Sequence, residues 1–269
     1  MSVTPSSLSH STIVTRLRAA GCVFAEDEAD LLLSTARTPD RLAAMVEQRI
    51  EGLPLEHVLG WAEFCGLRIA VDTGVFVPRR RTEFLVREAV ALARSRTPVG
   101  AVVVDLCCGS GAVGVALADA LEGIELHAAD VEPAAVRCAR RNITAVGGQV
   151  HQGDLFAALP AALRGRIDVL AANVPYVPSG AVGLLPTEAR VHEPLVALDG
   201  GPDGLDVLRR VTAEAARWLA PGGSLLVEAT ERQVPAVTAA FTAGGLVTRI
   251  AEDDDLYATV AIGTRSSQE

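Results

Sequence analysis

The chain has 269 residues, of which 49% are hydrophobic and 21% are charged. This composition is typical of a globular protein with an apolar core, and it excludes a disordered or fibrous chain. The formal net charge of −9 argues against a broad nucleic-acid-binding surface, because such a surface needs a dense basic face to bind phosphates. The net charge does not exclude a local contact with nucleic acid.

The sequence contains no signal for a membrane or for export. No stretch reaches the roughly 18 to 20 uninterrupted apolar residues of a membrane helix, and the amino terminus lacks an apolar signal core. The 5 cysteines are odd in number and never spaced Cys-x-x-Cys, which indicates neither a disulfide framework nor a zinc site. We expect a cytoplasmic monomer that holds no metal and contacts no membrane.

The amino-terminal part of the chain predicts short helices. Apolar residues recur at helical spacing in three segments, 13–20, 28–36 and 40–50. We therefore expect a small helical domain over residues 1–53.

The pattern changes over residues 54–78. Apolar residues alternate with polar ones around Gly66 and around an Asp-Thr-Gly turn at residues 72–74. This alternation predicts a β-hairpin that connects two domains, and we place the connector at residues 54–81.

From residue 82 onward, helices alternate with buried strands, which predicts right-handed crossovers and a mostly parallel sheet covered on both faces. The expected strands are residues 101–106, 125–129, 149–152, 168–172, 224–228, 247–252 and 257–262, and the expected helices are residues 83–94, 113–121, 133–146, 205–219 and 233–243. The last two strands are joined by residues 253–255 alone, too short for a crossover, so they must pair antiparallel at an edge. The second domain is expected to span residues 82–269.

A glycine turn follows the first of these strands. The sequence Asp105-Leu106-Cys107-Cys108-Gly109-Ser110-Gly111 leads from the strand into a helix, and glycine there lets a ligand approach the backbone. Asp130 ends the next strand, where a carboxylate can accept both hydrogens of a ribose diol. The turn predicts a nucleoside site, with a purely structural turn as the alternative.

The Asp-Leu-x-x-Gly-Ser-Gly pattern resembles motif I of the S-adenosylmethionine methyltransferases, and not the Gly-x-Gly-x-x-Gly of dinucleotide-binding folds. The resemblance implies S-adenosylmethionine as cofactor and a class I methyltransferase fold, α/β and Rossmann-like, with a seven-stranded, mostly parallel sheet. It places Asp105 near the amino-acid portion of the cofactor and Asp154 near its adenine; the alternative for Asp154 is a helix N-cap. Cys107 and Cys108 are expected to be small buried fillers. The candidate cofactor-binding residues are Asp105, Cys107, Gly109, Ser110, Gly111, Asp130, Val131, Asp154, Leu155 and Asn173.

A candidate acceptor site follows the fourth strand as Asn173-Val174-Pro175-Tyr176. Two oxygen acceptors that receive both hydrogens of an NH₂ group orient its nitrogen lone pair toward a methyl donor. The side-chain oxygen of Asn173 and the carbonyl of Val174 are those candidates, and Tyr176 would pack on a flat acceptor group. These four residues are the catalytic candidates. Taken alone, the sequence also fits an ordinary strand-to-loop turn.

The acceptor sequence resembles the Asn-Pro-Pro-Tyr motif of methyltransferases that act on planar nitrogen, either adenine N6 or the glutamine amide. Three further blocks, residues 54–66, 75–83 and 192–206, resemble the protein-(glutamine-N5) methyltransferases of the HemK/PrmC type. The resemblance covers residues 54–262 closely. It implies that the helical domain helps to hold a protein substrate, either a peptide chain release factor with a Gly-Gly-Gln loop or, in a sister group, ribosomal protein L3. The substrate-binding candidates are Asn173, Val174, Pro175, Tyr176, Pro78, Arg79, Thr82, Glu193 and Pro194.

Two departures from the family pattern indicate a divergent branch. Val174 replaces the first proline, which removes the fixed proline φ but keeps a carbonyl. Arg80-Arg81 stands where Pro-Glu is usual. The arginines at residues 79–81 would contact an acidic partner or ribosomal RNA, or form a solvated turn with carboxylates such as Glu83.

The leading hypothesis is an S-adenosylmethionine-dependent protein-glutamine N5-methyltransferase with a release factor as substrate. The alternatives are another protein such as ribosomal protein L3, nucleic-acid adenine N6, a small-molecule amine or amide, and a non-catalytic protein that kept the cofactor pocket. The acidic net charge disfavours the nucleic-acid alternative. The non-catalytic alternative is disfavoured by five motif residues that are intact: Asp105, Gly109, Gly111, Asp130 and Asn173.

Overall fold

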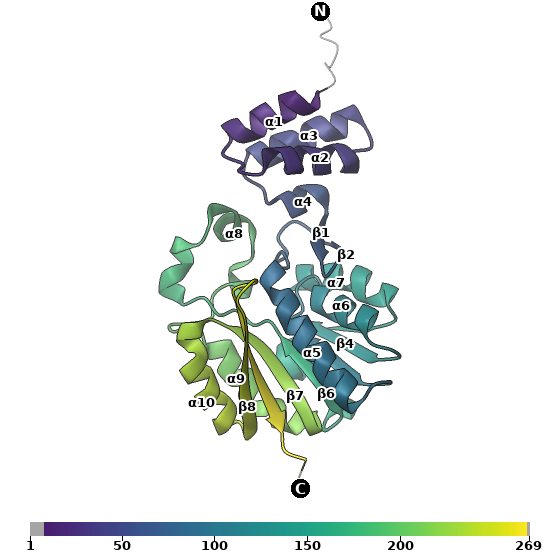
Figure 1. The fold of residues 1–269 in the computed structure, drawn as a ribbon, viewed down its shortest axis with the longest axis vertical. Helices are drawn as coiled ribbons and strands as arrows, with labels where there is room; N and C mark the ends of the chain where they lie inside the picture. Colours follow the sequence, from purple (N-terminus) through teal and green to yellow (C-terminus); the bar gives the residue numbers. More distant parts are fainter. Residues whose placement is uncertain (1–7, 268–269) are drawn as a thin grey trace, which may run out of the picture.

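The computed structural model describes residues 8–267, so residues 1–7 and 268–269 of the expected domains lie outside it. A small helical unit stands at one end of a larger α/β body, and the chain leaves the body at the opposite end (Figure 1). No helix within residues 8–267 is both long enough and apolar enough to cross a membrane.

The helical unit consists of α1 (His10–Ala19), α2 (Ala25–Thr35), α3 (Pro39–Ile50) and the short α4 (Leu55–Leu59). The apolar residues that recur at helical spacing form its core, which includes Ile13, Leu17, Leu32, Met45 and Val46. At the start of α3 the side chain of Thr38 accepts the backbone N–H of Arg41 at 3.2 Å, an N-cap. The short α4 is not predicted by the alternation that indicated a hairpin from residue 54.

The connecting hairpin is shorter than the sequence suggested. Strands β1 (Trp61–Phe64) and β2 (Leu67–Ala70) pair antiparallel, and Cys65 and Gly66 form the turn with φ of 52° and 74°. Residues 72–74 make a separate turn after the hairpin, closed by the N–H of Val75 on the carbonyl of Asp72 at 3.1 Å. The expectation that both turns belong to the hairpin is wrong, because two consecutive residues with positive φ already close it.

The body contains a seven-stranded sheet in the order β5-β4-β3-β6-β7-β9-β8. Its strands are β3 (Val102–Leu106), β4 (Glu125–Asp130), β5 (Gln149–Gln152), β6 (Ile167–Ala172), β7 (Leu219–Ala229), β8 (Leu246–Asp253) and β9 (Ala258–Arg265). Strands β3 to β7 are parallel, and β9 lies antiparallel between β7 and β8. The predicted fold class and the antiparallel pairing of the last two strands are confirmed, with β8 as the edge.

Helices cover both faces of the sheet. One face packs against α5 (Glu83–Arg96), α6 (Ala112–Ala120) and α7 (Pro133–Ala145), and the other against α9 (Asp206–Trp218) and α10 (Val234–Ala243). In β3, Val103 belongs to the first core and Val102 and Val104 to the second. The strand therefore reads as a continuous apolar run because both faces are buried.

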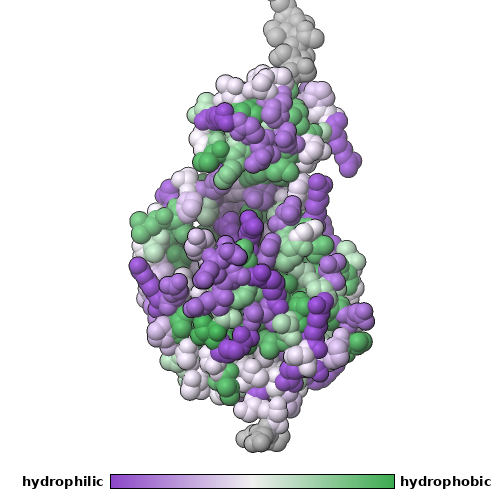
Figure 2. Space-filling model, in the orientation of Figure 1, coloured by the Kyte–Doolittle hydropathy of each residue, from purple (hydrophilic) through white to green (hydrophobic). Residues whose placement is uncertain are grey.

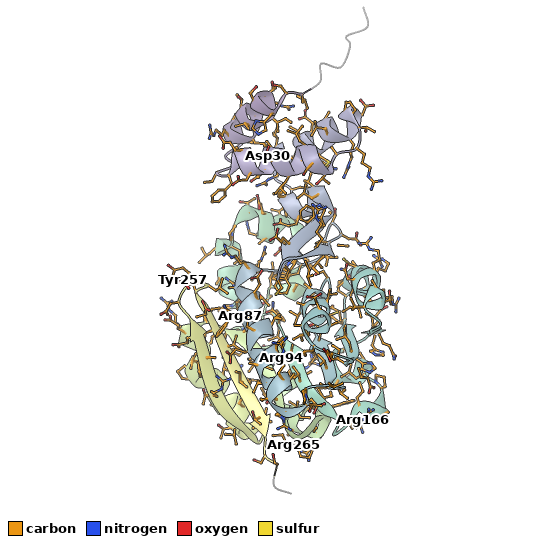
Figure 3. The ribbon with its side chains drawn as sticks, turned by 45° about the vertical axis from the view of Figure 1, so that its right-hand side comes forward. Asp30, Arg87, Arg94, Arg166, Tyr257 and Arg265 are labelled. Atoms are coloured by element: carbon orange, nitrogen blue, oxygen red, sulfur yellow. The ribbon has the colours of Figure 1, made fainter. Side chains whose placement is uncertain are left out.

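The β8–β9 hairpin pairs with β7 through β9 and forms two ion pairs with α5, one of them between Arg249 and Glu88. Arg87 on α5 pairs with Asp253 at the end of β8. Tyr257 lies in the connection, 91% exposed, at the end of the hairpin nearest the helical unit, while Arg265 lies at the far end (Figure 3).

A long segment leaves the carboxyl end of β6 and returns only at α9. It contains α8 (Thr187–His192), which lies between the helical unit and the body (Figure 1). Short 3-10 turns occur here and elsewhere, at Arg80–Thr82, Leu155–Ala158, Ala161–Leu163, Ser179–Leu184, Leu195–Ala197 and Glu231–Gln233. The sequence predicts no element between residues 173 and 204, because prolines and glycines interrupt any period there.

Candidate active site

A cavity of about 470 Å³ lies where β3, β4 and β6 end and where α8 approaches the body. Ligands of open α/β sheets bind at this position, outside the carboxyl ends of the strands. Figure 2 shows a hollow with many hydrophilic residues below the helical unit.

The glycine turn after β3 forms one wall of the cavity. Gly109 has φ of 54° and lines the cavity, and Cys107 before it has φ of 58°. Gly111 has φ of 80° but does not line the cavity; a Cβ there would lie 2.8 Å from Cγ1 of Ile143 on α7. Gly109 thus keeps the ligand side of the turn open, whereas Gly111 lets α6 and α7 pack closely.

Asp130 at the end of β4 is held by the backbone. Its Oδ2 accepts the N–H of Gly109 at 2.8 Å, and its Oδ1 accepts the N–H of Glu132 at 2.9 Å. Burial raises its pKa, although these two hydrogen bonds oppose the shift. A carboxylate has further lone pairs on both oxygens, so Asp130 can still accept two hydroxyls of a ribose.

Asp105 is buried and faces the same cavity. Its Oδ2 accepts the N–H of Gly114 at 2.8 Å, and within residues 8–267 it pairs with no basic side chain. Burial raises its pKa to about 8. A buried carboxyl that opens onto a cavity without a basic partner fits a ligand that carries positive charge. The ammonium and sulfonium of S-adenosylmethionine provide that charge.

Asp154 lies in the cavity wall and is exposed. Its Oδ2 accepts from Nη2 of Arg210 at 2.6 Å, and Arg210 lines the cavity as well. The side chain makes no cap hydrogen bond to the 3-10 turn that follows, so the N-cap alternative is not observed.

The adjacent cysteines Cys107 and Cys108 are both free thiols that line the cavity. Burial raises the pKa of each well above its usual value. Both therefore stay protonated and apolar at neutral pH, as expected for small fillers.

The acceptor loop after β6 leaves two oxygens free. Asn173 is half-buried and lines the cavity, and Val174 is 2% exposed. Among the described residues, no hydrogen bond occupies the side-chain amide of Asn173 or the carbonyl oxygen of Val174. The loop is held instead at Tyr176, whose carbonyl accepts from Nε2 of Gln233 at 3.0 Å.

Glu228 at the end of β7 joins three residues of the site. It is 4% exposed and accepts from Nε of Arg81 at 2.6 Å, from Oγ1 of Thr82 at 2.7 Å and from the hydroxyl of Tyr176 at 2.8 Å. Nη2 of Arg81 also donates to that hydroxyl. Burial, followed by the charge of Glu228, raises the pKa of Tyr176 above its usual value, so Tyr176 stays a phenol. The sequence analysis missed Glu228, which belongs to no motif.

Arg79, the other arginine of residues 79–81 that lines the cavity, also pairs with a buried carboxylate. Nη2 of Arg79 lies 2.6 Å from both carboxylate oxygens of Glu193, which is 6% exposed and does not line the cavity. The expected partner Glu83 accepts the N–H of Cys65 at 3.0 Å instead. Arg80 is exposed and makes no ion pair within the described chain. The turn is thus anchored by two buried carboxylates from distant elements.

Most of the predicted site residues meet in this one cavity. Those that line it are Asp105, Cys107, Gly109, Ser110, Asp130, Val131, Asp154, Leu155, Asn173, Val174, Pro175, Tyr176, Pro78, Arg79, Thr82 and Pro194. Gly111 and Glu193 stand behind it and support its walls. Lining residues for which the sequence indicated no role include Phe76, Glu132, Glu188 and Arg210. Arg81, which was expected to contact an acidic partner or ribosomal RNA, lines the cavity as well.

Comparisons with known proteins identify the relatives of this chain. Residues 68–193 match the family described as "Methyltransferase small domain". The chain is 44% identical to a release factor glutamine methyltransferase of Gloeobacter violaceus over 74% of this chain and 69% of that protein. It is 38% identical to a 4-amino-L-phenylalanine/4-methylamino-L-phenylalanine methyltransferase of Streptomyces pristinaespiralis over 86% of this chain and 80% of that protein.

A solved structure supports the fold alone. The ribosomal protein L11 methylase of Lactobacillus delbrueckii subsp. bulgaricus superposes with a TM-score of 0.52 at 15% identity, covering 74% of this chain and 85% of that one. The sequence relatives, the seven-stranded sheet and the cavity at its carboxyl edge all point to one family. The chain belongs to the release factor glutamine methyltransferase family of the HemK/PrmC type, the members of which are S-adenosylmethionine-dependent methyltransferases.

Proposed function

We propose that this protein methylates a planar nitrogen, and that its acceptor is the side-chain amide nitrogen N5 of a glutamine in a protein, with a peptide chain release factor as the first candidate. The observation that carries the proposal is the pair of free oxygens at Asn173 and Val174 beside the cavity that holds Asp105 and Asp130. Two acceptors next to a cofactor site are what the orientation of an NH₂ group requires.

The cofactor half of the cavity is made by the glycine turn and three carboxylates. Asp130 would hold the ribose hydroxyls, Asp105 would face the positively charged amino-acid portion, and Asp154 would lie near the adenine. S-adenosylmethionine supplies an electrophilic methyl group on a sulfonium. The protein's own contribution is therefore chiefly to position the acceptor.

An amide nitrogen is a poor nucleophile because its lone pair is delocalised into the carbonyl. Oδ1 of Asn173 and the carbonyl oxygen of Val174 would accept its two hydrogens and favour a pyramidal nitrogen. Tyr176 would pack against the flat amide, fixed in place by Glu228 and Gln233. One hydrogen stays on the methylated nitrogen and the other leaves as a proton.

The helical unit, which we assign to residues 1–53 with residues 54–81 as connector, would hold the protein substrate. Support comes from its position above the hollow in Figure 2 and from its contact with α8. We call the part of the cavity around Asn173 and Tyr176 its acceptor half. The residues there that would contact the substrate are Pro78, Arg79, Thr82 and Pro194.

A second candidate acceptor is the amine of a small aromatic amino acid. Two observations favour it: the relative from Streptomyces pristinaespiralis is covered over 80% of its length, and Arg81 lines the cavity where the family usually has glutamate. Ribosomal protein L3 and nucleic-acid adenine N6 are weaker candidates. The net charge of −9 disfavours the nucleic acid.

An acceptor panel tests the proposal. The protein is incubated with radiolabelled S-adenosylmethionine and, separately, with release factors, ribosomal protein L3, 4-amino-L-phenylalanine, and a pool of RNA and DNA. We expect label in a protein glutamine and, for the second candidate, in the aryl amine. Label confined to nucleic acid would contradict both.

A further inference from the structure

Arg81 lines the cavity beside Tyr176, and part of its guanidinium has no partner among residues 8–267. Its side chain is 46% exposed and lines the cavity. Nε donates to Glu228 and Nη2 donates to the hydroxyl of Tyr176, whereas Nη1 donates to no group within residues 8–267. The guanidinium therefore keeps an outer edge of free N–H groups, the fork that binds a carboxylate.

The buried partner orients Arg81 without cancelling its effect on a ligand. Glu228 is 4% exposed and does not line the cavity, so the positive end of the ion pair lies nearer to any bound molecule. Arg79 and Glu193 repeat this arrangement on the same turn. Because the attraction between charges falls with distance, a ligand in this half of the cavity meets two cations before their carboxylates.

The acidic residues that line the cavity do not cancel the positive charge of Arg79 and Arg81 in the acceptor half. Asp105, Asp130, Glu132 and Asp154 belong to the cofactor half, and Glu188 is bound by Arg49 of the helical unit at 2.5 Å.

Tyr176 links Asn173 and Arg81, the two ends of the acceptor half of the cavity. Its backbone belongs to the loop with the nitrogen-binding oxygens, and its hydroxyl end touches Arg81. The Arg81 guanidinium lies 5.7 Å from the centre of the ring. A flat acceptor packed on this ring, with its nitrogen at Asn173, would therefore extend its other end toward Arg81.

We propose that Arg81 is a specificity-determining residue that binds a carboxylate of the acceptor molecule, at a distance from the methylated nitrogen set by the Tyr176 side chain. The inference rests on the proposed function, methyl transfer to a nitrogen at Asn173. The carboxylate has two sources: the main-chain carboxylate of a free amino acid, or an acidic side chain beside a glutamine in a protein.

Two matched ligand pairs test the proposal and distinguish the sources. The first pair is 4-amino-L-phenylalanine and its carboxamide. The second pair is two peptides with blocked ends, one with glutamate and one with glutamine directly after Gly-Gly-Gln. Binding of each to the protein saturated with S-adenosylhomocysteine is measured by calorimetry, which needs no turnover.

We expect the carboxylate member of at least one pair to bind about tenfold tighter than its neutral match, as for a charge-assisted hydrogen bond. The pair that shows the preference identifies the source. The Arg81→Gln variant should bind both members alike. The double variant Arg81→Gln/Glu228→Gln should do the same, without an unpaired buried carboxylate that could unfold the protein. Arg80→Gln is the matched control, because Arg80 is exposed and does not line the cavity, and it should keep the preference.

Equal affinity within both pairs, no measurable binding of any carboxylate probe, or a preference that survives in Arg81→Gln would overturn the inference. Failure of the proposed function looks different: the carboxylate probe binds preferentially, but no acceptor receives a methyl group. Methyl transfer that is indifferent to the carboxylate would leave the proposed function intact and remove the role of Arg81.

Discussion

Nη1 of Arg49 on α3 lies 2.5 Å from Oε1 of Glu188 on α8, which joins the helical unit to the wall of the cavity. The same guanidinium donates from Nε to the buried Glu28 at 2.7 Å and from Nη2 at 3.1 Å. One arginine thus stabilises the helical unit internally and links it to the segment that covers the acceptor half.

Replacing Arg49 by methionine should destabilise the protein by about 3 kcal/mol, because it leaves the carboxylate of Glu28 buried and unpaired. Glu188→Gln should lower the free energy of unfolding by less than about 1 kcal/mol, since Glu188 is 46% exposed. Urea unfolding of both variants measures the difference. Equal losses would show that the ion pair with Glu28 contributes nothing beyond the surface contact.

The protonation of Asp105 should make stability depend on pH. Burial raises its pKa to about 8 in the native state, whereas an unfolded aspartate titrates near about 4. Between these pH values the native state binds more protons, so this group lowers the free energy of unfolding as the pH rises toward 8. The Asp105→Asn variant should lack that part of the pH dependence in urea unfolding. Parallel curves for the variant and the parent protein would contradict the shift.

The same group should couple cofactor binding to proton release. A positively charged ligand favours the ionised carboxylate, so S-adenosylmethionine should displace a proton from Asp105 below about pH 8 and bind more tightly as the pH rises from about 6 to 8. Calorimetry in two buffers of different ionisation enthalpy counts the protons. An Asp105→Asn variant that releases as many protons as the parent would assign them to another group.

Asn173→Ala should reduce methyl transfer at least about a hundredfold while S-adenosylmethionine still binds, because only an acceptor for the N–H groups is removed. Val174→Pro is the matched change. It keeps the carbonyl, and the N–H of Val174 makes no hydrogen bond in the described chain, so transfer should stay within about tenfold. The measurement is the rate of methyl transfer by each variant at saturating S-adenosylmethionine. Unchanged turnover in Asn173→Ala would place the acceptor site elsewhere.

Asp130→Ala should raise the Kd for S-adenosylmethionine about a hundredfold, because a carboxylate that accepts two hydroxyls is lost. Asp154→Ala should raise the Kd less than about tenfold, since Asp154 is exposed and already forms an ion pair with Arg210. Calorimetric titration compares the two. A larger effect at Asp154 would reverse these assignments.

The sequence predicted the central elements because each has a strong local signal. β3 reads as a continuous apolar run that is buried on both faces, and the apolar spacing of residues 40–50 marks α3. The short link of residues 253–255 left antiparallel pairing as the geometric solution for β8 and β9, and the structure has it. The sequence also predicted that the glycine turn after β3 and the loop after β6 lie together, because parallel strands bring their carboxyl ends to one edge.

The rest depended on contacts that no local pattern encodes. Glu228 lies 147 positions from Arg81 and 52 from Tyr176, and only the fold brings the three together. α8 lies in a segment rich in proline and glycine and is positioned by Arg49 of the helical unit. The alternative in which the arginines of residues 79–81 pair with Glu83 is wrong for the same reason, because two buried carboxylates from other elements bind Arg79 and Arg81 instead.

Tandem mass spectrometry of the methylated product tests the central claim most directly. The parent protein and Asn173→Ala are incubated with S-adenosylmethionine and each acceptor of the panel. We expect the parent protein to add the mass of one CH₂ group to the side-chain nitrogen of a glutamine or to an aryl amine, and Asn173→Ala to add none. A methyl group on an oxygen, on a carbon or on a nucleic-acid base, or equal modification by the variant, would contradict it.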